Sequence, residues 1–103
     1  MAKRNVDIAR QARAIDWLKA EMVAADGQIL RAMVQGDDEQ IIDGLADSII
    51  THYLIARRLG IHFARLDARI QMILRSNAMK QHELEQWFGD LSALAAYLHN
   101  KEE

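Results

Sequence analysis

The sequence predicts an all-α protein, and three observations carry this prediction. The 103 residues include no proline and only five glycines, so few positions force a helix to end. Apolar residues make up 50% of the chain, and they recur at the spacings of three and four that are typical of helices. No Asn-Gly turn or sustained alternation indicates a β-hairpin. We therefore expect a single domain, residues 1–103, built from four to five helices.

The first expected helix runs from about Asp7 to Gln35. The pattern fits one long helix, and it fits equally a short helix followed by a longer one with a break at 14–16. Gly27 lies inside this stretch and is expected to mark a close crossing with another helix, and Gly36 is placed to cap the C-terminus. The apolar stripe of this first expected helix consists of Ile8, Ala12, Ile15, Leu18, Met22, Ile29 and Met33.

The second expected helix is capped by Asp37 or Asp38 and runs to about Leu59, with Gly60 after it. Its apolar positions cover a wider arc than the stripe of about 100° on an ordinary surface helix. A chain this short cannot cover two faces of one helix, so we expect self-association into a homodimer or homotetramer. The apolar positions are Ile41, Ile42, Leu45, Ala46, Ile49, Ile50, Tyr53, Ala56 and Leu59.

The remaining helices are expected to be shorter. A third helix spans about Phe63 to Arg75, and Ser76 and Asn77 end or interrupt it. After a polar stretch, Asp90 is predicted to cap a last helix. No linker or internal repeat divides the chain, which supports one domain.

Charge and composition exclude several classes of protein. Thirteen basic against fifteen acidic residues give a net charge of −2, so we expect no nucleic-acid partner. The absence of cysteine excludes disulfides and Cys-ligated zinc and fits a reducing compartment. No apolar run approaches the ~20 residues of a membrane span, and no hydrophobic region follows the charged start. We therefore expect a cytoplasmic protein with no membrane partner.

Carboxylates are the residues that most nearly suggest chemistry. Asp43 and Asp47 lie four residues apart on the second helix, and Glu21 lies on the first. Carboxylate oxygens at this spacing on facing helices are suitable ligands for Mg²⁺, although a hydrated surface pair explains them equally. No two of the four histidines are three or four residues apart, so local zinc ligation is unsupported.

Four stretches together resemble the MazG-type nucleotide pyrophosphohydrolases. They are residues 22–32 (MVAADGQILRA), 36–39 (GDDE), 44–47 (GLAD) and 56–61 (ARRLGI). The resemblance implies a MazG-like helical bundle whose core and site are completed by oligomerisation. It also implies hydrolysis of nucleoside triphosphates to monophosphate and pyrophosphate. In that family Mg²⁺ is held by a Glu-Glu-x-x-Glu motif on one helix and a Glu-x-x-Asp motif on the next.

Carried over residue by residue, most of this metal site is missing. The two leading glutamates fall on Ala24 and Ala25, and the third falls on Gln28. The second motif keeps its aspartate as Asp47, but its glutamate falls on Gly44. Alanine and glycine offer no ligand oxygen, so we expect Mg²⁺ to bind weakly or not at all.

Three hypotheses about function follow. The favoured one is a weakly active or inactive MazG-like protein that binds a nucleotide or related phosphorylated molecule, with Gln28 and Arg58 contacting the ligand, or that acts in assembly. The second is an active pyrophosphohydrolase with a rearranged site of Asp47, Asp43 and Glu21. The third is a helical interaction module without a nucleotide role. The sequence assigns no catalytic residue and leaves open whether the protein is an enzyme.

Overall fold

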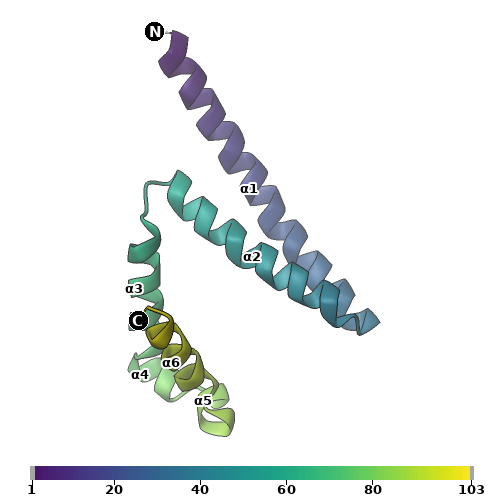
Figure 1. Ribbon diagram of the computed structural model, residues 1–103, viewed down its shortest axis with the longest axis vertical. Coiled ribbons are helices and arrows are strands. Elements are labelled where there is room, and N and C mark those ends of the chain that lie inside the picture. The colour runs from purple at the N-terminus through teal and green to yellow at the C-terminus, as the bar shows by residue number, and fades with distance from the viewer. Residues whose placement is uncertain (1, 103) are drawn as a thin grey trace. The chain divides into compact units, whose positions relative to one another are not determined.

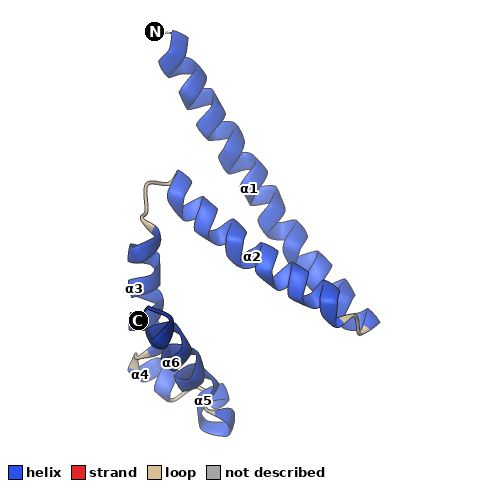
Figure 2. Cartoon of the chain, in the orientation of Figure 1, coloured by secondary structure: helices blue, strands red, loops and turns tan. Residues whose placement is uncertain are grey.

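The computed structural model describes residues 2–102, with side chains described for residues 5–101. This part of the chain contains only helices, turns and loops, with no strand (Figure 2), which confirms the all-α prediction. Six helices are present instead of four to five, because the polar stretch before the last helix forms two short ones. The helices are α1 (Ala2–Gln35), α2 (Asp38–Arg58), α3 (Phe63–Leu74), α4 (Asn77–Lys80), α5 (Glu83–Phe88) and α6 (Asp90–Glu102).

The described residues divide into two compact units. Unit 1 extends to Phe63 and contains α1 and α2, which lie side by side in opposite directions (Figure 1). Helix α1 is continuous over its 34 residues, so the alternative with a break at 14–16 does not form. Neither proline nor glycine occurs near those positions, and the backbone hydrogen bonds of the helix continue through them.

The turn between α1 and α2 forms as its residues predict. Gly36 adopts a φ of +69°, a left-handed conformation that glycine reaches without steric penalty. Asp37 is the N-cap of α2, and its carboxylate accepts a hydrogen bond from the backbone N–H of Gln40 at 3.2 Å. Both predictions at this turn are confirmed. At the other end of α2, Gly60 has a φ of +82° and directs the chain away from the helix.

The interface of α1 and α2 has a seven-residue period. Leu18, Ala25 and Ala32 are 4%, 1% and 1% exposed on α1, and Gly44 and Thr51 are buried on α2. A seven-residue repeat keeps one seam of each helix facing its partner, as in a left-handed coiled coil. Because most of these side chains are small, the two backbones approach closely. This close approach limits the size of the side chains that fit between α1 and α2.

Unit 2 begins at Ala64 and contains most of α3 together with α4, α5 and α6. Ser76 caps α4 by accepting the backbone N–H of Met79 at 3.3 Å. Gly89 ends α5 in the left-handed conformation, with a φ of +69°. Helix α6 starts at Asp90, so this residue is the first of the helix and the prediction that it is the cap was wrong. None of the described helices combines the length and apolar character needed to cross a membrane.

A side-chain contact joins α5 to α6. The hydroxyl of Ser92 donates to Oε2 of Glu85, and the backbone N–H of Ser92 donates to Oε1 at 3.1 Å. These hydrogen bonds favour the carboxylate, the hydroxyl most strongly, and they lower the pKa of Glu85 below its ordinary value of 4.5.

We predict that this contact makes the stability of unit 2 sensitive to acid. A lowered pKa adds stability above 4.5, and this stability is lost as the pH falls through the lower pKa of the folded chain. The thermal unfolding midpoint of Ser92→Ala should therefore fall less on acidification than that of the wild type. Glu83→Gln, on the same short helix, is the control. Thermal unfolding measured across the acidic range tests this. An identical pH dependence in the wild type and Ser92→Ala would contradict it.

Candidate functional site

The site suggested by the sequence lies along α1 and α2, where the family's glutamates would fall. Ala25 is 1% exposed and sits in the seam between the two helices, whereas Ala24 is exposed on the outside of α1. The two adjacent positions therefore face different surroundings. A carboxylate at position 24 would reach water, and one at position 25 would be enclosed by α2.

Gly44 marks a close approach of the two helices. A Cβ atom added to this glycine would lie 2.8 Å from Cγ1 of Ile29 and 3.6 Å from the backbone nitrogen of Ile29. No side chain fits there without displacing Ile29, which is β-branched and stiff. A Cβ on Gly27 would meet nothing within 4 Å, so the prediction that Gly27 marks the crossing was wrong. The crossing glycine is Gly44, the position where the resemblance implies a metal-binding glutamate.

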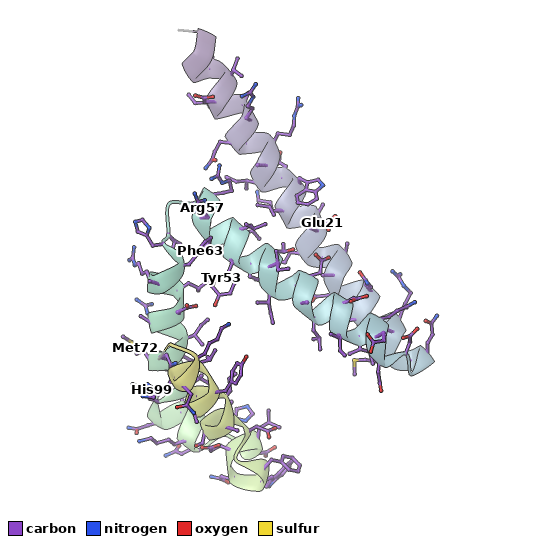
Figure 3. The ribbon with its side chains drawn as sticks, viewed as in Figure 1. Glu21, Tyr53, Arg57, Phe63, Met72 and His99 are labelled. Carbon is purple, nitrogen blue, oxygen red and sulfur yellow. The ribbon has the colours of Figure 1, made fainter. Side chains whose placement is uncertain are left out.

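The three carboxylates proposed for a rearranged site are dispersed. Asp43 and Asp47 are exposed on α2. Glu21, labelled in Figure 3, is half-buried on α1. Among the side chains of residues 5–101, no three from His, Cys, Asp or Glu gather closely enough to hold a metal ion. Mg²⁺ needs several oxygen ligands at short range in near-octahedral geometry, and the described side chains do not bring three such groups together.

The two residues predicted to contact a ligand, Gln28 and Arg58, lie far apart along the helices of unit 1. Arg58 pairs with Gln11: its Nη1 donates to Gln11 Oε1 at 3.2 Å, and Gln11 Nε2 donates to the Arg58 carbonyl. Gln28 is half-buried on α1, seventeen residues beyond Gln11. At 1.5 Å per residue this separation is about 25 Å, too far for both to contact one small molecule. No sequence signal indicates Gln11, because a pairing this distant in the chain depends on helix register.

Two adjoining hollows flank Arg57 and Arg58 at the end of α2. One has a volume of about 330 Å³ and is walled by Trp17 together with Ala14, Leu18 and Leu54. The other has a volume of about 300 Å³ and is walled by residues 60–63. Both volumes are at the small end of the range for ligand pockets. Trp17, which belongs to no motif of the sequence, is 60% exposed.

Aromatic side chains gather around Arg57 (Figure 3). The guanidinium carbon of Arg57 lies 5.7 Å from the centre of the Phe63 ring, within cation–π range. The ring of Tyr53 meets that of Phe63 edge to face at 5.7 Å. Guanidinium groups bind phosphate, and exposed indole stacks on planar rings. Trp17, Arg57 and Arg58 therefore form an arginine–tryptophan corner suited to a phosphorylated aromatic molecule.

Comparison with known proteins identifies the family. The sequence model of the MazG-like family matches residues 8–91, which include parts of both units. Neither a curated protein nor a solved structure matches the chain. Because the match covers most of the sequence, the chain belongs to the MazG-like family.

Proposed function

We propose that this member of the MazG-like family binds a nucleotide or related phosphorylated molecule without hydrolysing it, and that it self-associates. The observation that carries the proposal is the close packing at Ala25 and Gly44. These positions contribute to the contact between α1 and α2 and supply no metal ligand. Binding requires only groups that recognise phosphate, whereas hydrolysis also requires an activated water.

The missing negative charge supports the loss of hydrolysis. Asp47 is the one acid kept from the family's two motifs, and it is exposed. Magnesium gives up its water reluctantly, and a single carboxylate supplies little attraction to offset that dehydration. We therefore propose that resident Mg²⁺ is weakly held or absent.

The arginine–tryptophan corner supports the retained binding. Arg57 and Arg58 also complement the C-terminal end of α2, where cations are favoured, so their charge alone has a structural explanation. Trp17 is exposed although burial of its large indole would stabilise the chain, which is expected of a surface that contacts another molecule. Stacking a nucleobase on Trp17, with phosphate against the guanidinium groups, uses both features.

A turnover assay tests the catalytic half of the proposal. Purified protein incubated with a panel of NTPs and dNTPs, with Mg²⁺ or Mn²⁺, should release no pyrophosphate. Release of pyrophosphate that Asp47→Ala abolishes would overturn this half and favour the rearranged metal site.

Fluorescence and melting temperature test the binding half. In a Trp87→Phe background Trp17 is the sole indole, since the chain has two tryptophans. A bound nucleotide should quench Trp17 and raise the melting temperature by mass action. Arg57→Gln should weaken binding by about tenfold, the loss expected for one charged phosphate contact, whereas Arg31→Gln should not. Neither quenching nor a melting shift with any nucleotide would favour the interaction module instead.

Self-association is supported by a second apolar face on α2. Ile42, Leu45 and Ile49 are 56%, 48% and 59% exposed. Each lies at least about 100° around α2 from Gly44 and Thr51, which face α1. We expect light scattering to give a dimer or tetramer at micromolar concentration, and Ile49→Lys to shift it toward monomer. Val34→Lys, on α1, is the matched control because Val34 is 90% exposed. A monomeric wild type would contradict the prediction.

A further inference from the structure

Unit 2 contains a buried polar side chain that lacks a partner. Gln71 is 8% exposed and is the one buried residue of α3. Its Nε2 and Oε1 atoms have no hydrogen-bond partner among the protein atoms that the structure describes. A buried amide without partners is destabilising, and native proteins nearly always satisfy such groups. Each exception therefore needs an explanation, and a bound molecule is one.

Gln71 is one of the residues that line a cavity of about 690 Å³ within unit 2. Its volume falls within the range of small-molecule sites. Ala64 and Ala68 follow one another at a spacing of four residues, and their short side chains leave the space open. Met72 lies on α3 and His99 lies on α6 (Figure 3). The lining residues are Ala64, Ala68, Gln71, Met72, Arg75 and His99.

Arg75 supplies positive charge on the same face as Gln71. Arg75 follows Gln71 by four residues, so the two side chains are neighbours. Arg75 lies just past the end of α3, and its backbone N–H still donates to the Gln71 carbonyl at 3.2 Å. A guanidinium group recognises carboxylate or phosphate through paired donors. Met72 is flexible and 64% exposed, so the wall of the cavity can adapt to an entering molecule.

We infer that the cavity between α3 and α6 binds a small anionic molecule that carries adjacent carbonyl and N–H groups. The anionic group meets Arg75, and the carbonyl and N–H pair with the Gln71 amide, which offers one donor and one acceptor side by side. Both parts of this recognition come from unit 2 residues. The inference is therefore independent of the arginine–tryptophan corner of unit 1.

Three probes separate the two parts of this recognition. Orotate carries a carboxylate and an imide edge, uracil has the imide edge alone, and benzoate has the carboxylate alone. In nitrogen–proton correlation spectra of the full chain, orotate should shift the Gln71 side-chain amide and the Arg75 Nε–H. Uracil and benzoate should bind at least about tenfold more weakly, since each lacks one contact. The absence of shifts at these two side chains with orotate at about 10 mM would overturn the inference.

Two variants and one control test the residues themselves. Gln71→Leu should weaken orotate binding by about tenfold or more, and it should raise the melting temperature because it removes an unpaired buried amide. Arg75→Gln should weaken orotate binding by about tenfold or more. Arg69→Gln is the control, since Arg69 is exposed and lies about 200° around α3 from Gln71. Unchanged orotate binding in Gln71→Leu, or an equal loss in Arg69→Gln, would overturn the inference.

Discussion

Ala25→Glu is expected to lower the free energy of unfolding by about 3 kcal/mol or more, because it places a carboxylate with no partner between two packed helices. Ala25 is 1% exposed, so neither water nor a counter-ion reaches the new side chain without separating α1 from α2. Ala24→Glu, one residue earlier on the same helix, is exposed and should change stability by less than about 0.5 kcal/mol. The measurement is urea unfolding followed by far-ultraviolet circular dichroism, at one fixed protein concentration.

This pair of variants also tests the interpretation of the site. Both substitutions restore glutamates that the family resemblance implies, so a latent metal site should respond to them. If Mg²⁺ stabilised the double variant Ala24→Glu, Ala25→Glu more than the wild type, the seam would be able to open around a metal. Equal losses from the two single variants would show that α2 does not enclose Ala25.

The elements predicted well from the sequence depend on local chemistry. Gly36 and Asp37 are predictable as the helix end and the cap, because a left-handed conformation and a capping carboxylate involve only neighbouring residues. The seam is less predictable. Met33 belongs to the apolar stripe expected for the first helix but is 60% exposed, because the contact with α2 selects a seven-residue period.

Residues that depend on register are not predictable in the same way. Gly27 and Gly44 are both helical glycines, and composition alone does not say which one meets another helix. That depends on how α1 and α2 are aligned, and the alignment brings Ile29 to Gly44. The pairing of Arg58 with Gln11 has the same origin. A buried glutamine on α3 likewise has no sequence signal, since Gln71 resembles any exposed helical glutamine in its intrinsic preference.

The candidate site, too, is predictable from the sequence only in part. The family resemblance implies metal-binding glutamates at positions 25 and 44, where this chain has alanine and glycine. Their burial and close contact give them a second property, since each is part of the surface through which α1 packs on α2. A glutamate introduced at position 25 or 44 should therefore disturb the packing of α1 on α2.

Gly44→Glu should consequently destabilise the chain by about 3 kcal/mol or more, through overpacking and burial of a charge together. The substituted Cβ alone would lie 2.8 Å from Ile29 Cγ1, which is closer than real Cβ contacts come. Gly27→Glu is the matched control: it also replaces a helical glycine by glutamate, but in open space. Because glutamate is the better helix former, this control should gain about 0.5 kcal/mol. Thermal and urea unfolding measure both.

A double-mutant cycle separates steric contact from charge. Gly44→Ala adds only the clashing Cβ, and Ile29→Ala removes the Cγ1 atom that it meets. If the contact is the cause, Gly44→Ala should be less harmful, or favourable, when Ile29→Ala is present, with a coupling of about 1 kcal/mol. Additive effects would mean that Ile29 does not limit the approach. In that case the helices could admit larger side chains at position 44, and the missing glutamate would reflect lost chemistry alone.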